Sequence, residues 1–112
     1  MARDDYHVII YQILSYLYQQ LKRGKEVDTK MLESNGKLFQ INESYYLFII
    51  ESLLREDFIT GPVIEETMTG KFLDGLEYTQ ITVRGIEYLM DNAFLSKAKR
   101  FLKDVKEITP FI

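Results

Sequence analysis

One stretch in the middle of the chain, residues 41–64, constrains the fold more than any other. Its first part repeats apolar side chains at helical spacing, and its last part changes to the shorter period of a strand. Asn42 is a good N-cap for this helix, because its side-chain oxygen can accept a hydrogen bond from an unpaired N–H of the first turn. The apolar stripe comprises Tyr46, Ile49, Ile50, Leu53 and Leu54. We therefore expect a central core helix that runs directly into a β-strand.

The other face of this helix is polar, with one exception. It carries Ser44, Phe48, Glu51, Ser52 and Arg55. Phe48 is an aromatic residue on the polar side, so we expect its side chain to be exposed, whereas the remaining apolar residues of the helix belong to the core.

The rest of the chain predicts further helices and a hairpin. The helices are expected at about 5–23, 29–34, 42–57, 83–91 and 97–108, and the hairpin strands at about 58–65 and 76–81, with a polar tip between the strands. The buried face of the first helix is expected to comprise Tyr6, Ile10, Ile13, Leu14, Leu17 and Leu21. Ser15 is expected to face water, Met90 to point inward, and Asp28 and Thr82 to cap helices.

Length and composition indicate a single domain, 1–112, large enough for one modest core. The chain has no cysteine, which favours a cytoplasmic protein without disulfides or thiolate chemistry. The N-terminus lacks the pattern of a signal peptide, and no apolar run approaches the length of a membrane span. The net charge of −3 gives no general attraction to nucleic acid or to acidic lipid. We expect no membrane partner.

The order of the expected elements is helix, short helix, long helix, hairpin, and then a helix opened by Ile81-Thr82-x-x-Gly85. This is the order of a winged helix-turn-helix. The predicted fold class is α+β, with a three-helix core, a β-wing of two to three strands and additional C-terminal helices.

Several short segments carry a more specific resemblance. They are Ile59-Thr60-Gly61, Ile81-Thr82-x-x-Gly85-x-x-Tyr88-Leu89, Asn92 and Lys97-Ala98-Lys99. On these segments the chain resembles the YjcQ family of small Gram-positive and prophage-associated proteins, over most of its length. The resemblance implies a winged helix similar to DNA-binding domains, and it implies no catalytic residues.

Nothing in the sequence indicates catalysis. His7 is the only histidine and lies beside the apolar face of the first helix, where a partly buried, hydrogen-bonded role is expected. One histidine without cysteine cannot form a zinc site of the usual types. Gly70-Lys71 lacks the glycine spacing and the Ser/Thr of a phosphate-binding loop. We expect no enzymatic activity, no cofactor and no metal site.

Local charge bears on DNA binding. In the usual docking mode the third helix enters the major groove and the wing contacts the flanking backbone. Residues 26–57 contain three bases and seven acids, and residues 60–80 contain one base and four acids, so both expected contact surfaces repel phosphate. Two hypotheses remain: a DNA-binding transcription regulator, which the fold favours, and a protein–protein interaction module that uses the acidic surface without binding DNA. Candidate contacts for either are Lys30, Lys37, Ser44, Phe48, Glu51, Arg55 and Lys71.

The last predicted helix is basic. Its basic side chains are Lys97, Lys99, Arg100, Lys103 and Lys106. A solvated face of an amphipathic helix explains them best, and a basic patch that complements an acidic partner is the alternative. The apolar stripe of this helix can pack on its own domain or on a second copy, so a homodimer formed through the C-terminal helices is a further hypothesis.

Overall fold

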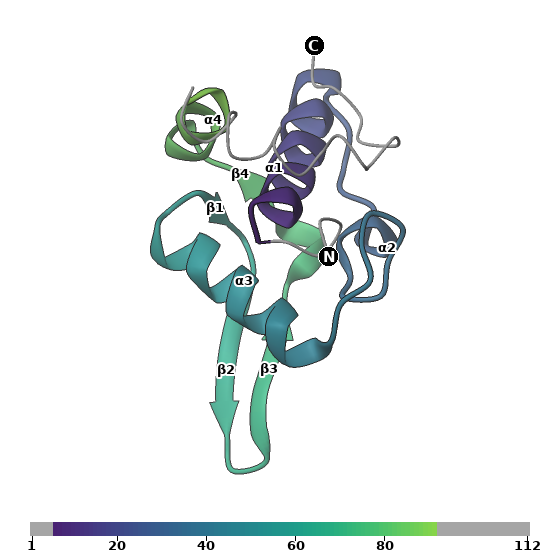
Figure 1. Ribbon diagram of the computed structural model, residues 1–112, viewed down its shortest axis with the longest axis vertical. Coiled ribbons are helices and arrows are strands. Elements are labelled where there is room, and N and C mark those ends of the chain that lie inside the picture. The colour runs from purple at the N-terminus through teal and green to yellow at the C-terminus, as the bar shows by residue number, and fades with distance from the viewer. Residues whose placement is uncertain (1–5, 92–112) are drawn as a thin grey trace.

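The computed structural model describes residues 6–91, which form an α+β domain of four α-helices and two small antiparallel sheets (Figure 1). The helices are α1 (Tyr6–Arg23), α2 (Thr29–Leu32), α3 (Glu43–Arg55) and α4 (Val83–Met90). The strands are β1 (Ile59–Thr60), β2 (Val63–Thr67), β3 (Gly70–Asp74) and β4 (Gln80–Ile81), with the short 3₁₀ helix η2 (Leu76–Tyr78) before β4. Within this range, no helix combines the length and the apolar character that crossing a bilayer requires. The helix predicted at 97–108 lies outside the described residues.

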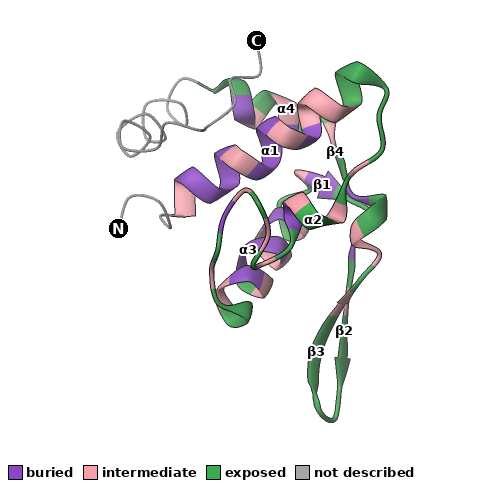
Figure 2. Cartoon of the chain, turned by 90° about the vertical axis from the view of Figure 1, so that its right-hand side faces the viewer, coloured by how far each residue is buried: buried purple, intermediate pink, exposed green. Residues whose placement is uncertain are grey.

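The first helix, α1, is the most deeply buried helix of the described range, so the centre of the core lies earlier in the chain than the central stretch suggested (Figure 2). Eight of its residues are buried, against four in α3. α1 packs against α4 and β4. Its Gln12 donates a hydrogen bond of 2.9 Å from Nε2 to the carbonyl of Leu38, in the loop before α3. Neighbours on several sides therefore cover this helix.

The predicted faces of α1 are wrong at two positions. Ser15 is buried rather than solvated, because its hydroxyl donates to the carbonyl of Tyr11, 2.6 Å away in the preceding turn, and needs no water. Leu21 is 42% exposed, because the last turn of α1 extends beyond Leu17, the final buried residue of the helix. Met90 is likewise 40% exposed, at the last residue of α4.

Side-chain caps begin three of the helices, and all three confirm the predicted capping residues. Asp28 accepts a hydrogen bond from the N–H of Lys30, and Asn42 accepts one from the N–H of Tyr45. Thr82 caps α4 in the same way. Each cap satisfies an N–H group that has no partner within its helix.

The end of α3 has its own stop signal. Asp57 has a φ of +62°, in the left-handed region. The N–H of Asp57 then donates to the carbonyl of Leu54, and the N–H of Phe58 donates to the carbonyl of Leu53 at 2.9 Å. These two bonds form a Schellman motif, which ends the helix at Arg55 and turns the chain toward β1.

The β-ribbon differs from the predicted hairpin. The strand predicted at 58–65 is interrupted at Gly61-Pro62, and the first half of the strand predicted at 76–81 is the 3₁₀ helix η2. Two ladders result, β1 with β4 and β2 with β3, and the chain reverses at Met68-Thr69 rather than across a long tip. Gly61 explains the interruption: its φ is +112°, and a Cβ there would lie 2.2 Å from the carbonyl oxygen of Tyr78. The two backbones meet at this point instead of pairing.

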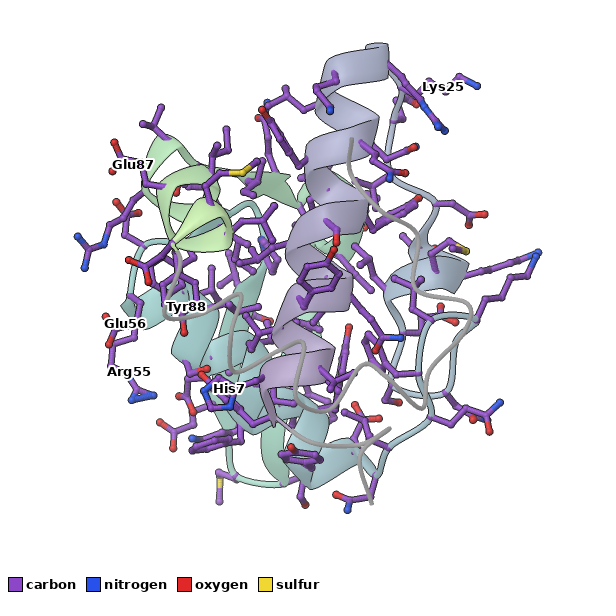
Figure 3. The ribbon with its side chains drawn as sticks, turned by 45° about the horizontal axis from the view of Figure 1, so that its top comes forward. His7, Lys25, Arg55, Glu56, Glu87 and Tyr88 are labelled. Carbon is purple, nitrogen blue, oxygen red and sulfur yellow. The ribbon has the colours of Figure 1, made fainter. Side chains whose placement is uncertain are left out.

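A cluster of contacts, here called the α4 clamp, holds the start of α4 against the end of α3. Thr82 donates from Oγ1 to the carbonyl of Asp57 at 2.6 Å and from its N–H to the carbonyl of Phe58 at 3.1 Å. Gly85 lies so close that a Cβ there would be 2.3 Å from the Phe58 carbonyl oxygen. The ring of Tyr88 stacks on the ring of Phe58 with centroids 4.4 Å apart. Tyr88 lies between α4 and the end of α3 (Figure 3), and burial, with smaller contributions from nearby acidic groups, raises its pKa.

We expect Gly85→Ala to destabilise the domain by about 1–3 kcal/mol, because a methyl group cannot fit against the Phe58 carbonyl without moving α4. Chemical denaturation followed by circular dichroism measures this loss. Glu87→Ala, on the exposed side of the same helix, is the matched control and should change stability by no more than about 0.5 kcal/mol. Equal stability of the two variants would contradict the role of the α4 clamp.

Because Tyr46 is buried, we expect the domain to lose stability at high pH. Its hydroxyl donates to the carbonyl of Leu32 at 2.6 Å, and burial raises its pKa far above the usual value. The unfolded tyrosine ionises near pH 10 whereas the folded one does not, so its stabilising contribution is complete below about pH 10 and is lost as the pH rises further. Tyr46→Phe should make this alkaline decline shallower, while costing about 1–2 kcal/mol at neutral pH because the Leu32 carbonyl loses its donor. Denaturation midpoints between neutral and alkaline pH test this, and an equally steep alkaline decline in Tyr46→Phe and in the unchanged chain would contradict it.

Candidate recognition surface

Four of the predicted contact residues lie on one side of α3, here called the α3 face. They are Ser44, Phe48, Glu51 and Arg55. Phe48 is 55% exposed, in agreement with its place on the polar side of the helix. Ser44 and Arg55 are also exposed, and Glu51 is half-buried. The α3 face therefore presents an aromatic ring between polar groups.

Tyr6 extends this face from another helix. Its ring centroid lies 6.4 Å from that of Phe48, and its hydroxyl lies 3.1 Å from Oγ of Ser52. The periodicity of α1 places Tyr6 on the buried side, and nothing in the sequence indicates that the first residue of α1 meets the outer side of α3. Tyr6 is half-buried and supports the Phe48 ring, which stays more than half exposed.

The β2–β3 hairpin contacts α3 through Glu51. Nζ of Lys71, on β3, lies 3.4 Å from a carboxylate oxygen of Glu51, and the two side chains are 42% and 41% exposed. The structure thus brings together two predicted contact residues that are distant in the sequence. Because Lys71 is the only base of the hairpin, this ion pair partly neutralises the one cation that the hairpin could offer to a phosphate.

The remaining surface of the hairpin is acidic and apolar. Its acids are Glu65, Glu66 and Asp74. Val63 and Phe72 are 55% and 51% exposed, and Met68 at the turn is fully exposed. Phe72 falls in the predicted tip, between the expected strands at 58–65 and 76–81, and Val63 is not among the predicted contact residues. Alternation along β3 was the available signal, because Phe72 and half-buried Leu73 point to opposite faces of a strand.

Lys30 and Lys37 form a separate pair of exposed bases. The N–H of Lys37 donates to the carbonyl of Lys30 at 3.2 Å, so the backbone brings the two residues together beside α2. Among residues 6–91, no ion pair or hydrogen bond joins either side chain to the α3 face. The basic residues Lys97, Lys99, Arg100, Lys103 and Lys106 lie outside the described residues.

A cavity of about 330 Å³ lies away from the α3 face, between the end of α1, the loop after it and the segment from η2 to β4. Its lining includes Leu17, Leu21, Val27 and Tyr78. Residues 6–91 contain no group of three or more His, Cys, Asp or Glu side chains that could hold a metal ion. His7 lies edge-on to the ring of Tyr6, with centroids 5.6 Å apart.

The Glu51–Lys71 ion pair is expected to contribute little to stability, since half-exposed pairs are screened by water. A double-mutant cycle with Glu51→Gln and Lys71→Met should give a coupling energy below about 1 kcal/mol. Denaturation of the single and double variants measures it. A larger coupling energy would mean that the hairpin depends on this pair for its position, and that changes at Glu51 cannot be interpreted as changes of surface alone.

No curated protein and no solved structure matches the chain. The family model described as YjcQ protein matches residues 11–108, and this match confirms the resemblance that the short sequence segments indicated. The matched range includes most of α1, the α3 face, the hairpin and the whole of the α4 clamp. The chain belongs to the YjcQ family.

Proposed function

We propose that this protein is a winged-helix-type recognition module that binds a basic protein partner through the α3 face and the hairpin, and that it has no catalytic role. In this proposal α3 is the recognition helix and the β2–β3 hairpin is the wing. The observation that carries the proposal is the charge of this surface: acids predominate on it, and Lys71 is already paired with Glu51.

Electrostatics favours a basic partner over nucleic acid. Phosphate contacts from Lys and Arg supply most non-specific affinity for DNA. On the α3 face Arg55 is the only base, at the last residue of the helix, and Glu51 occupies the middle of the face. A phosphate backbone placed along α3 would meet carboxylates, whereas lysine or arginine side chains of a protein would find complementary charge there.

Phe48 supplies the apolar contact that a protein interface needs. Aromatic residues are enriched at the centres of such interfaces, where a ring is surrounded by polar groups that exclude water. Phe48 has this arrangement, with Ser44 and Glu51 one turn away on either side. The contact with Tyr6 restricts the ring, which lowers the conformational entropy lost on binding.

A pull-down with the full chain as bait tests the proposal. We expect a basic protein to be retained by the unchanged chain and lost with Phe48→Ala or with Glu51→Lys, each lowering affinity by about tenfold or more. Glu87→Lys is the matched control, because it makes the same charge reversal at an exposed position of α4. Retention of the partner by both α3 variants would exclude this surface as the binding site.

DNA binding is the second candidate function, favoured by the order of the elements and by the hairpin that contacts the same helix. Winged helices dock with the third helix in the major groove and the wing on the flanking backbone. Exposed Lys30 and Lys37 are the bases that such a complex would use beside α2. Titration of a labelled random duplex at low salt should then show binding that weakens with salt and with Lys30→Glu plus Lys37→Glu. Absence of any shift at low salt would count against this candidate.

A further inference from the structure

In the described part of the chain, the β2–β3 hairpin has two edges that no other strand covers. It extends away from the helices, and most of its surface is exposed (Figures 1 and 2). Within residues 6–91, β2 and β3 pair only with each other. The side chain of Lys71 links β3 to α3, whereas no side-chain hydrogen bond or ion pair within residues 6–91 links β2 to any element other than β3. The outer edge of β2 is therefore the more accessible of the two.

The register identifies the backbone groups on that edge. The hairpin closes through the pair Thr67–Gly70 around a two-residue turn, and such a closing pair is hydrogen-bonded. In an antiparallel ladder hydrogen-bonded pairs alternate with pairs whose N–H and C=O groups point away from each other. The pairs containing Ile64 and Glu66 are of the second kind. Ile64 and Glu66 therefore direct their N–H and C=O groups to the outer edge of β2, where no hydrogen bond within residues 6–91 occupies them.

Side chains beside this edge favour a particular occupant. Glu65 and Glu66 are neighbours on β2 and so point to opposite faces of the hairpin. Val63 and Phe72 lie on the same face as Glu65: Phe72 is directly opposite Glu65 on β3, and Val63 lies two residues before it on β2. Both apolar side chains are half-exposed. On one face, the side chains of a strand added here would lie next to the Glu66 carboxylate. On the other face, they would lie next to the Glu65 carboxylate and the apolar side chains of Val63 and Phe72.

Charge distinguishes between two kinds of strand that could be added to this edge: a second copy of β2 and a basic segment of another protein. A second copy of this chain would pair its own β2 edge with this one and bring glutamates together, which is unfavourable and is a common protection of exposed edges against self-association. A basic segment would instead be attracted electrostatically to these glutamates. Apolar residues between its basic residues would contact Val63 and Phe72.

We propose that the outer edge of β2 binds an extended basic segment of a partner protein as an added β-strand, with its N–H and C=O groups bonded to those of Ile64 and Glu66. Main-chain hydrogen bonds supply affinity in this mode of binding, and side chains alternating along the strand supply specificity. The inference rests on the proposed function, because it specifies how the basic partner of the acidic surface is held.

The experiment uses the full chain and a synthetic decapeptide of alternating lysine and valine. Its control is the same peptide N-methylated at every residue, which keeps the side chains and the charge but removes the N–H groups of both edges. We expect fluorescence anisotropy to show binding of the first peptide and binding about tenfold weaker or worse for the second, since several backbone hydrogen bonds are lost. Equal binding of the two peptides would overturn strand addition.

Two variants at one position test the edge from the side of the protein. Glu66→Pro removes the carboxylate and the outward N–H, whereas Glu66→Gln removes only the charge. Proline is tolerated where the N–H of an edge strand faces solvent, so the hairpin should survive, and circular dichroism checks this. We expect Glu66→Pro to weaken binding of the alternating peptide about fivefold to tenfold more than Glu66→Gln does. Equal weakening would mean that charge alone holds the peptide.

Hydrogen exchange distinguishes failure of this inference from failure of the proposed function. Peptide binding should slow exchange of the Ile64 and Glu66 amides and leave those of Lys71 and Leu73 unchanged. If a basic protein is captured through Phe48 and Glu51 while neither the peptides nor the Ile64 and Glu66 amides respond, the recognition surface stands and strand addition is wrong. If no basic protein is captured and the alternating peptide does not bind, both are wrong.

Discussion

The contact between the start of α4 and the end of α3 is the interaction on which the rest of the structure depends. Two consecutive carbonyls, those of Asp57 and Phe58, accept both hydrogen bonds that Thr82 donates. The missing side chain of Gly85 permits this approach, and the stacked rings of Phe58 and Tyr88 cover it from the side. Each named residue of the segment Ile81-Thr82-x-x-Gly85-x-x-Tyr88 therefore makes a specific contact. Ile81 adds the remaining one, because it pairs with Ile59 in the β1–β4 ladder.

This clamp also determines where the proposed recognition surface forms. The β1–β4 ladder begins at the clamp, and the hairpin continues from it beyond Gly61 and Gly75. The Schellman turn at Asp57 sets the angle at which α3 leaves the ladder. With both elements anchored at one place, Glu51 and Lys71 approach within 3.4 Å although they lie on different elements. The clamp therefore fixes the position of the hairpin, and the weak Glu51–Lys71 ion pair affects its orientation only slightly.

Fold and function separate in this protein. The scaffold specifies a helix and a β-hairpin side by side, but the chemistry that they present depends on a few exposed side chains. Acids on the hairpin, Glu51 on the α3 face and the pairing of Lys71 give a surface that attracts cations rather than phosphate. Phe48 adds an apolar group at the middle of that surface.

Features that depend on neighbouring residues could be predicted from the sequence. Asp28, Asn42 and Thr82 cap helices because an N-cap needs only its own side chain and the next three backbone N–H groups. The α3 stripe and the exposed side of Phe48 follow from the 3.6-residue period in the same way. The split of the β-ribbon could not be predicted, because it results from the approach of Gly61 to the Tyr78 carbonyl, far along the chain.

The sequence by itself therefore determined the α-helices of residues 6–91, the caps of three of them, the exposure of Phe48 and the acidic balance of the surface. Only the tertiary structure decided that α1 is the most buried helix of residues 6–91, that Lys71 is paired with Glu51, that Tyr6 supports Phe48 and that no strand of the described range pairs with the outer edge of β2. The physical reason is the range of the forces involved. Propensity and capping act within one turn of the chain, whereas burial, ion pairing and strand-edge exposure depend on which distant segments occupy the space around a residue.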